Sequence, residues 1–190
     1  MKIIYVARTF LDYRIPVFRE LKNIKGIELK VFYNSEATPL NVQIKAKKEL
    51  GESLRGFNGE KKIVFGNPSI RLSNKWLRLT YQPGLIRNIR KEKPDIIIGD
   101  GFFQWTFYLF IVHLLYKIPL VICYERTSYT ERSAQWFRKL YRKLVIRHIS
   151  AICCSGKLCR EYIISLGMAP ERITLGHMVI DVDQFIKPPT

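Results

Sequence analysis

Short apolar runs rich in β-branched residues alternate with segments of helical spacing along most of this 190-residue chain. Runs without a polar face are typical of parallel strands that are covered by helices on both sides of a sheet. The alternation therefore predicts an α/β fold with a doubly wound, mostly parallel sheet. The predicted strands are residues 2–7, 27–33, 62–65, 95–99, 120–124, 151–154 and 172–176.

The segments between these strands carry helix start and stop signals. Asp12 is placed to cap a helix that has Pro16 in its first turn and Gly26 just past its end. The longest apolar segment, 102–116, has about 15 residues against the roughly 20 needed to cross a bilayer, so we expect a core helix. Other helices are predicted at 41–50, at 85–89, at 134–148 and between Ser155 and Gly167.

Ligands of open α/β sheets bind beyond the carboxyl ends of the strands. The candidate ligand-binding loop after the first strand lacks the G-x-G-x-x-G pattern, and no G-x-x-x-x-G-K-[ST] occurs in the chain. Neither a dinucleotide site nor a P-loop is therefore expected, and we expect no cofactor in this domain. The segments that follow predicted strands are 8–14, 100–103, 125–131, 155–157 and 177–181.

The cysteines and histidines show no metal-ligand spacing. Cys123, Cys153, Cys154 and Cys159 lie in or beside apolar runs and include no C-x-x-C pair. This distribution favours buried, reduced thiols in a cytosolic protein over a disulfide framework or a zinc site. The three histidines are scattered along the chain, and no metal is expected.

The chain has 32 lysines and arginines against 16 acidic residues, a formal net charge of +16. Such a surface attracts nucleic acid, anionic lipid or phosphorylated small molecules, and charge alone does not choose among them. A basic nucleic-acid-binding α/β module is one open possibility, because tyrosine and tryptophan stack on single strands. The chain contains no recognition-helix or RNP-like motif, so specific nucleic acid binding is not the leading expectation.

The chain ends with a short apolar strand, an Asp-x-Asp-x-Phe turn from Asp181 to Phe185, and then Pro188 and Pro189. This pattern is typical of the exit from a domain into an interdomain hinge. We expect residues 1–187 to form one Rossmann-like domain and residues 188–190 to begin the hinge, with a second domain absent from the chain.

Several weak motifs follow one another in a recognisable order. They are Lys93-Pro94-Asp95 before a strand, Pro119 before the next, a basic helix, a strand ending at Ser155, a helix closed by Gly167, Pro170-Glu171-Arg172-Ile173, and Asp181-x-x-x-Phe185. In this order, over residues 1–9 and 93–185, the chain resembles the N-terminal domain of the family 4 retaining glycosyltransferases, which have the GT-B architecture.

The resemblance implies two Rossmann-like domains facing a cleft. In the family the N-terminal domain mostly binds the acceptor, and the C-terminal domain holds the nucleotide sugar. Arg8 and Thr9 stand where the family often has a glycine pair, and Glu125, by its spacing from Pro119, stands where many members carry a histidine. Of the usual P-N-G-V-D before the hinge, only Asp181 is retained.

Glu125 and Arg126 directly follow an apolar strand at the edge of the sheet where ligands bind. A carboxylate there can hold sugar hydroxyls or accept a proton from an acceptor hydroxyl, so Glu125 is the candidate catalytic residue. Arg126 can bind a phosphate through two parallel hydrogen bonds. The alternative is a local ion pair between the two residues that only fixes the loop.

The other loops supply further candidates for binding the acceptor. Ser155 and Lys157 open a helix directly after a strand, where free N–H groups and the helix dipole favour an anion, although an ordinary N-cap has the same sequence. When Arg8, Asp12, Asp100 and His177 are each taken singly, a structural role is favoured over a catalytic one. The remaining cleft candidates are Arg8, Thr9, Asp12, Asp100, Phe102, Ser128 and His177.

The helix predicted at 134–148 is both basic and amphipathic. Its apolar face, expected to pack on the sheet, consists of Trp136, Phe137, Leu140, Tyr141, Leu144 and Val145. A basic face with an aromatic anchor can lie on an anionic membrane, whereas the alternative is an ordinary crossover helix; the two roles are compatible. The membrane-surface candidates are Trp136, Arg138, Lys139, Arg142, Lys143 and Arg147.

The leading hypothesis is the acceptor-binding half of a retaining glycosyltransferase that acts in cell-surface polysaccharide synthesis. The complete enzyme would move a sugar from a nucleotide sugar to a glycan or lipid-linked acceptor, in the cytoplasm or at the inner face of the membrane. The chain alone is expected to be inactive, because the donor site would belong to the other half. A sugar-nucleotide epimerase of the same architecture stays open beside the nucleic-acid module, and it would need no acceptor.

Overall fold

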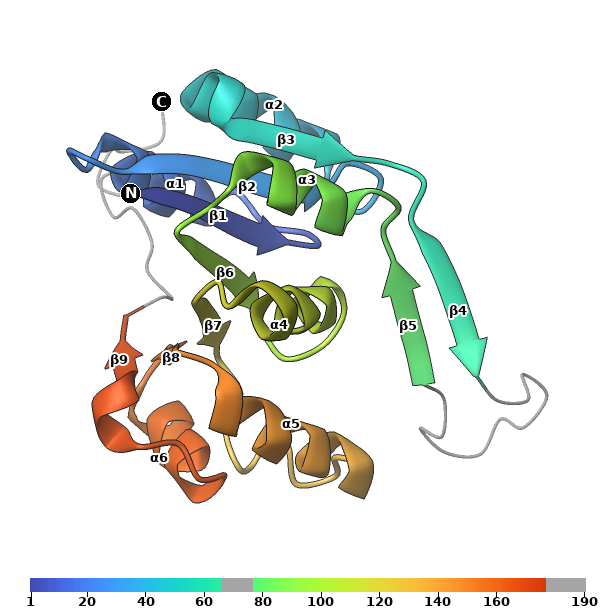
Figure 1. The fold of residues 1–190 in the computed structure, drawn as a ribbon, viewed down its shortest axis with the longest axis vertical. Coiled ribbons are helices and arrows are strands. Elements are labelled where there is room, and N and C mark those ends of the chain that lie inside the picture. Colours follow the sequence, from blue (N-terminus) through green and yellow to red (C-terminus); the bar gives the residue numbers. More distant parts are fainter. Residues whose placement is uncertain (66–76, 177–190) are drawn as a thin grey trace, which may run out of the picture.

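The computed structural model describes residues 1–65 and 77–176. Its main sheet is built from β1 (Lys2–Ala7), β2 (Glu28–Asn34), β3 (Leu54–Phe57), β6 (Ile96–Asp100), β7 (Leu120–Tyr124), β8 (Ala151–Cys154) and β9 (Ile173–Leu175). The strand order is β3-β2-β1-β6-β7-β8-β9, and each neighbouring pair is parallel (Figure 1). The predicted doubly wound, Rossmann-like sheet is therefore confirmed.

Helices connect most of these strands. They are α1 (Arg14–Asn23), α2 (Leu40–Leu50), α3 (Leu85–Glu92), α4 (Trp105–Tyr116), α5 (Trp136–His148) and α6 (Lys157–Ser165), with short 3₁₀ turns at Gly51–Ser53 and Pro170–Arg172. Every helix predicted from the sequence is present, with ends shifted by a few residues. Within the described residues, no helix combines the length and the apolar character that a membrane span needs.

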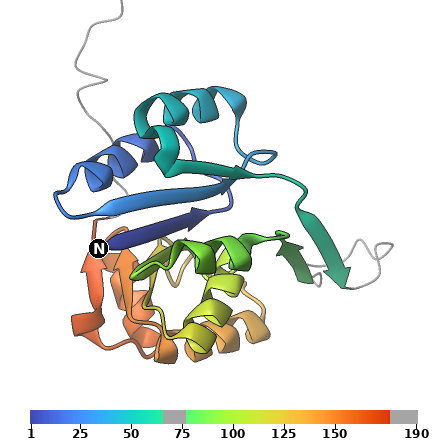
Figure 2. The ribbon, with the colours of Figure 1, turned by 45° about the horizontal axis from the view of Figure 1, so that its top comes forward.

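A separate hairpin departs from the prediction. The strand predicted at 62–65 exists as β4 (Lys61–Phe65), but it pairs antiparallel with β5 (Leu77–Tyr81) in a two-stranded sheet of its own. This hairpin stands away from the main sheet (Figures 1 and 2). The edge of the main sheet is formed instead by β3, which has only four residues and contains Gly56 and an exposed Arg55. Such a short run, in which arginine and glycine separate two apolar residues, gives no strand signal in the sequence.

Two apolar cores lie on opposite faces of the main sheet, so the strands are covered on both sides (Figure 2). Tyr5 belongs to the core beneath α1 and α2, together with Phe18 of α1. The next residue, Val6, points to the other face and joins the core beneath α3 to α6, where Trp105 is almost fully buried. Successive strand residues point to opposite faces of the sheet, and each face is covered by an apolar core. Residues on both faces must therefore be apolar, which explains the continuous apolar runs.

The start of α1 differs from the prediction. Asp12 makes no capping hydrogen bond to the helix, and Tyr13 occupies the N-cap position. The Asp12 carboxylate lies 3.6 Å from Lys45 Nζ of α2, and only its backbone oxygen accepts a bond from the helix, from Ile15 N at 3.0 Å. The loop after β1 thus holds α1 through backbone contacts, and the prediction that Asp12 caps the helix is wrong.

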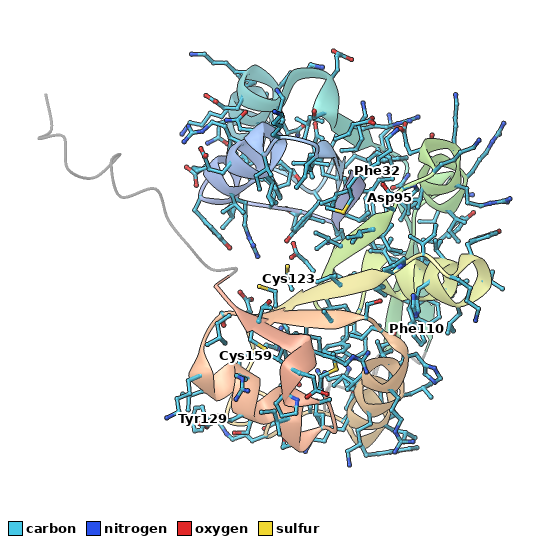
Figure 3. The ribbon with its side chains drawn as sticks, turned by 60° about the vertical axis from the view of Figure 1, so that its left-hand side comes forward. Phe32, Asp95, Phe110, Cys123, Tyr129 and Cys159 are labelled. Atoms are coloured by element: carbon cyan, nitrogen blue, oxygen red, sulfur yellow. The ribbon has the colours of Figure 1, made fainter. Side chains whose placement is uncertain are left out.

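The four cysteines are free, and Cys123, Cys154 and Cys159 are buried. Figure 3 shows Cys123, a residue of β7, and Cys159, on α6, in the interior, whereas Tyr129, in the loop after β7, lies at the molecular surface. A hydrogen bond with Cys153, together with burial, raises the pKa of the Cys123 thiol well above its ordinary value. The Cys123 thiol is therefore protonated near neutral pH.

The close packing of α4 on β6 depends on Gly99. A Cβ atom at this position would lie 2.8 Å from Leu109 Cδ1 and 2.8 Å from Thr106 Oγ1, closer than real Cβ contacts allow. We predict that Gly99→Ala lowers the free energy of unfolding by about 1–3 kcal/mol, because α4 must move away from the sheet. Chemical denaturation followed by circular dichroism measures the change.

Gly156 provides the matched control for this substitution. Its backbone is extended and nothing lies within 4 Å of a Cβ added there. Gly156→Ala should change the unfolding free energy by no more than about 1 kcal/mol. Equal destabilisation by the two substitutions would contradict the packing explanation.

Candidate functional site

A cavity of about 510 Å³ opens at the carboxyl ends of β1, β6 and β7. The strand order reverses between β1 and β6, because the chain runs from β1 outward to β3 and then returns to start the other half of the sheet. Open α/β sheets bind their ligands at this switch point. The cavity is lined by Thr9, Phe10, Leu11, Tyr13, Arg14, Asp100, Gly101, Phe102, Phe103, Gln104, Cys123, Tyr124, Glu125, Arg126, Arg138 and Arg142.

Asp100, the last residue of β6, is held by donors from two other elements. Tyr5 Oη of β1 donates to Asp100 Oδ1 at 2.6 Å, and Arg14 Nη2 of α1 lies 3.6 Å from the same oxygen. Burial, together with the negative charge of Asp100, raises the pKa of Tyr5 well above its usual value. The phenol therefore keeps its proton, and Asp100 is an oriented hydrogen-bond acceptor on the cavity wall.

A second carboxylate, Glu131, links the loop after β7 to α5. Its Oε2 lies 2.6 Å from Arg142 Nη2, and its Oε1 lies 3.2 Å from Arg126 Nη1. The side chains of Glu131 and Arg142 are only 4% and 3% exposed, whereas Arg126 is 61% exposed. Arg126 therefore pairs with Glu131 and not, as the sequence suggested as an alternative, with Glu125.

Glu125 is the exposed carboxylate of the cavity wall. It directly follows β7, so its backbone is fixed by the parallel sheet while its side chain reaches solvent. Ser155 Oγ, at the end of the neighbouring β8, donates to the backbone oxygen of Glu125 at 3.4 Å. This arrangement leaves a carboxylate where a ligand hydroxyl can approach it.

The loop between β6 and α4 forms another part of the wall. Phe103 lies against two arginines of α5, with its ring centroid 5.4 Å from Arg138 Cζ and 5.2 Å from Arg142 Cζ. Gln104, at the N-cap of α4, has φ 58° and ψ −127°, a conformation that normally requires glycine. Strain of this kind is kept where the surrounding structure demands it, often at a binding site.

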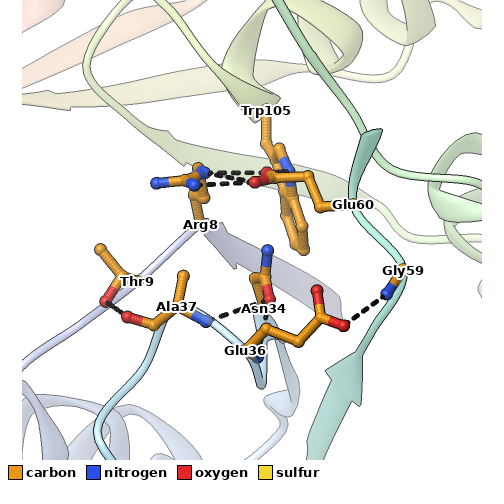
Figure 4. A network of polar contacts seen from close by, with 8 residues as sticks. All are labelled: Arg8, Thr9, Asn34, Glu36, Ala37, Gly59, Glu60 and Trp105. Carbon is orange, nitrogen blue, oxygen red and sulfur yellow. Dashed lines mark hydrogen bonds and ion pairs between the residues drawn. The ribbon is translucent and has the colours of Figure 1, made fainter. Parts of the chain in front are cut away.

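A buried network beside the cavity joins the loop after β1 to the hairpin (Figure 4). Glu60, only 3% exposed, accepts hydrogen bonds from Arg8 Nε and Nη2 and from Trp105 Nε1, at distances between 2.7 and 3.0 Å. Burial opposes ionisation of Glu60, but the hydrogen bonds from Arg8 and Trp105 outweigh it and lower its pKa. The network is therefore an ionised latch between β1, α4 and β4.

The sequence matches the family model described as Glycosyltransferase Family 4 over residues 18–184. The chain belongs to Glycosyltransferase Family 4. A search of curated protein sequences returned no match. The site described above is therefore the strand-end cavity of a family 4 glycosyltransferase domain.

Solved structures of nucleotide-sugar enzymes share the fold. The UDP-GlcNAc 2-epimerase from Neisseria meningitidis, bound to UDP-GlcNAc, has a TM-score of 0.60 at 15% identity and covers 92% of this chain and 46% of its own. The S. aureus MnaA–UDP structure gives 0.60 at 17% identity, covering 92% and 43%. Anabaena Alr3699/HepE, in complex with UDP and glucose, gives 0.59 at 12% identity, covering 100% and 47%. This glycosyltransferase domain thus spans less than half the length of these GT-B-like proteins, and such identities show the fold alone.

The structure brings about half of the predicted cleft residues together. Thr9, Asp100, Phe102, Glu125 and Arg126 all line the cavity. Of the others, Arg8 is bound to Glu60 and Asp12 faces Lys45, while Ser128, Ser155 and Lys157 do not line the cavity. His177 lies outside the described residues, as do Asp181 and the predicted hinge at 188–190.

Several residues of the site gave no signal in the sequence. Arg14 and Glu131 stood out in no motif, and each acquires its role through an ion pair with another element. Glu60 lies in the irregular segment before the hairpin, for which the family resemblance offered no support. The one available signal was Arg126, five residues before Glu131, since charged neighbours at that spacing in a loop can pair.

The orientation of α5 corrects the prediction for its two faces. Arg142 was expected on the membrane surface, but it is buried against Glu131 and cannot meet a lipid headgroup. Three residues of the predicted inward face are instead exposed: Trp136 by 76%, Leu140 by 60% and Leu144 by 49%. The helix is turned so that Val145 and Ile146 reach the core while Arg138 and Arg142 reach the cavity.

We predict that Glu60→Gln lowers the free energy of unfolding by about 1–3 kcal/mol at pH 7, because the buried charge-assisted bonds to Arg8 and Trp105 are weakened. The folded-state pKa of Glu60 is lowered, so its stabilising contribution is complete above the ordinary value near 4.5 and is lost as pH falls through the folded pKa. The difference between wild type and variant, measured by denaturation, should shrink below about pH 4.

Glu52→Gln is the matched control for Glu60→Gln. Glu52 is 96% exposed and pairs with Lys47 at 3.2 Å on the surface. Its substitution should change stability by less than about 1 kcal/mol. A Glu60→Gln variant as stable as wild type at pH 7 would show that the hydrogen bonds of Glu60 to Arg8 and Trp105 do not stabilise the fold.

Proposed function

We propose that this domain is the acceptor-binding half of a retaining glycosyltransferase. In the complete protein a second domain would hold the nucleotide sugar across a cleft, as the family resemblance implies. The observation that carries the proposal is the cavity at the switch point of the sheet, with Glu125 exposed on its wall. The membership in Glycosyltransferase Family 4 supports the reaction class.

In this proposal Glu125 hydrogen-bonds the acceptor hydroxyl that attacks the anomeric carbon of the donor sugar. The new glycosidic bond forms on the face of the sugar from which the nucleoside diphosphate departs with the electrons of the broken bond, so the configuration is retained, and the proton of the attacking hydroxyl passes to the carboxylate. Asp100, held by Tyr5 and Arg14, would orient a second hydroxyl. The less buried apolar residues of the wall, Leu11, Tyr13 and Phe103, offer surface to a sugar ring.

The acceptor we propose is a glycan or lipid-linked molecule of cell-surface polysaccharide synthesis, handled at the cytoplasmic face of a membrane. The exposed stripe of Trp136, Leu140 and Leu144 on α5 supports this placement, because Lys139, Lys143 and Arg147 lie beside it on the same exposed side. Apolar and aromatic residues flanked by basic ones are typical of a helix that lies on an anionic membrane.

A sugar-nucleotide epimerase is the second candidate function. The structures of UDP-GlcNAc 2-epimerases from several organisms superpose on this chain with TM-scores up to 0.60, which supports it. An epimerase converts its nucleotide sugar without an acceptor, so the two functions are distinguished by one assay. The test is to express the protein that the natural reading frame encodes and to incubate it with nucleotide sugars. A transferase forms product only when an acceptor is added, whereas an epimerase forms product without one.

We predict that Glu125→Gln in the complete enzyme lowers kcat for sugar transfer by about 10²-fold or more, because an amide cannot accept the proton of the acceptor hydroxyl. The melting temperature should not change, since the side chain is exposed. Rates of product formation at saturating acceptor and thermal denaturation measure the two quantities. Glu161→Gln, an exposed glutamate on α6 outside the cavity, is the control. Transfer at the wild-type rate by Glu125→Gln would exclude this residue as the base.

We predict that the chain binds vesicles containing anionic lipid and that Lys139→Gln with Lys143→Gln weakens this binding about fivefold for each charge removed, since each basic residue at such a surface contributes about 1 kcal/mol. Trp136→Ser should weaken binding further by removing an exposed aromatic anchor. Vesicle sedimentation at two salt concentrations measures the partition coefficient. Lys48→Gln, on α2 at the far side of the sheet, is the control (Figure 1). Equal binding to neutral and anionic vesicles would refute the electrostatic part.

A further inference from the structure

Four arginines from three different elements reach the wall of the cavity: Arg14, Arg126, Arg138 and Arg142. Asp100 and Glu125 share the wall, and Glu131 lies behind it in contact with two of the arginines. The arginines thus outnumber the carboxylates around the cavity. Guanidinium groups gathered in this way are typical of sites for phosphate, which they bind through paired hydrogen bonds.

Three of these arginines are held in place before any ligand arrives. Glu131 contacts both Arg126 and Arg142, and the ring of Phe103 lies close to the guanidinium groups of Arg138 and Arg142. Contacts on one side fix each guanidinium while other N–H groups stay available. A site that is organised in advance spends less conformational entropy on binding.

Several polar atoms at the α5 corner of the cavity, among them the hydroxyl oxygens of Tyr124 and Tyr162, are buried without a hydrogen-bond partner among the described residues. Nε of Arg138, and Nε and Nη1 of Arg142, have no hydrogen-bond partner within the part of the chain that the structure describes. Arg142 is among the most buried charged residues of the domain, at 3% exposure. Buried donors without partners are rare and call for an explanation, and the oxygens of an anion would supply the missing acceptors.

The start of α4 reaches the same corner. Gln104, in its glycine-like conformation, lies on the cavity wall at the N-cap of this twelve-residue helix. The N–H groups of a first helical turn, together with the helix dipole, favour a negative charge. The strained turn thus places the positive end of α4 near the arginines of α5, against which Phe103 of the same loop packs.

We propose that this corner binds a phosphoryl group of the acceptor, so that the acceptor is a phosphate or diphosphate ester. The inference rests on the proposed function, because it takes the ligand of this domain to be the acceptor. On α5, Arg138 and Arg142 lie about half a turn of the helix away from Leu140, on the opposite side. The phosphoryl group would therefore lie about one helix diameter, roughly 10 Å, from the exposed stripe that we assign to the membrane.

The test is calorimetric titration of the chain with inorganic pyrophosphate at physiological salt. Arg138→Gln and Arg126→Gln should each weaken binding about tenfold, which corresponds to the loss of a charge-assisted hydrogen bond. Both variants keep the buried pair of Glu131 and Arg142, so they should fold. Arg87→Gln, which removes the same charge from an exposed position on α3, should leave the affinity within about twofold.

Equal weakening of pyrophosphate binding by all three substitutions would show a general charge effect and overturn the proposal. The absence of pyrophosphate binding to the wild-type chain would overturn it as well.

Titration with UDP separates the two possible sources of a diphosphate. If UDP binds and is weakened in the same way, the site belongs to the donor, and the acceptor assignment falls. Farnesyl phosphate binding more tightly than inorganic phosphate would support a lipid-linked ester, and equal binding a water-soluble one.

The transfer assay on the complete enzyme separates this proposal from the function on which it rests. Unchanged transfer to a phosphorylated acceptor by the Arg138→Gln enzyme overturns the phosphoryl site and leaves the glycosyltransferase intact. Absence of transfer by the wild-type enzyme, while the chain still binds pyrophosphate through these arginines, overturns the proposed function and supports the anion site.

Discussion

Burial of the ion pair between Glu131 and Arg142 decides how α5 lies on the sheet. An unpaired charge at either position would be very costly in the interior, so the helix must turn until Arg142 meets Glu131. Val145 and Ile146 then reach the core one turn further on, and Trp136, Leu140 and Leu144 are left outside. The cavity wall and the exposed stripe are thus two consequences of one contact. Apolar residues of similar volume would stabilise such a site as well, so the pair matters for orientation more than for stability.

The sequence predicted the architecture well because parallel strands leave a strong mark. Strands such as Lys2–Ala7 and Leu120–Tyr124 are apolar on both faces, and their boundaries agree with the prediction. The prediction was wrong where local pattern carries little information. The four residues of β3 pack as an edge strand although Gly56 interrupts them, and β4 turns to pair with β5. Its apolar run alone could not show which partner it would choose.

From the sequence, only those residues of the candidate site that lie at the ends of strands could be predicted. Glu125 and Asp100 follow or end apolar strands, so their position at the ligand edge followed from topology. Arg142 and Glu131 could not be found in this way, because a basic residue on an amphipathic helix normally faces solvent. Glu131 lies in a loop and Arg142 on α5, so the two residues pair only because the tertiary fold brings these elements together. Asp12 shows the opposite case. Its local sequence is that of a helix cap, but its carboxylate lies near Lys45 of another helix instead.

Membership in Glycosyltransferase Family 4 does not by itself identify a substrate, because one fold carries many activities and specificity lies in the site. In this domain the residues that line the cavity come from three loops and from the helices α1 and α5, which meet at the switch point of the sheet. The latch of Arg8, Glu60 and Trp105 holds two of those elements, the end of β1 and the start of α4, in fixed relation. Because Gln104 immediately precedes Trp105, the latch also constrains the strained turn beside the arginines. The charged groups around the cavity are therefore positioned by the body of the domain, and the acceptor that we propose would meet side chains that are already held in place.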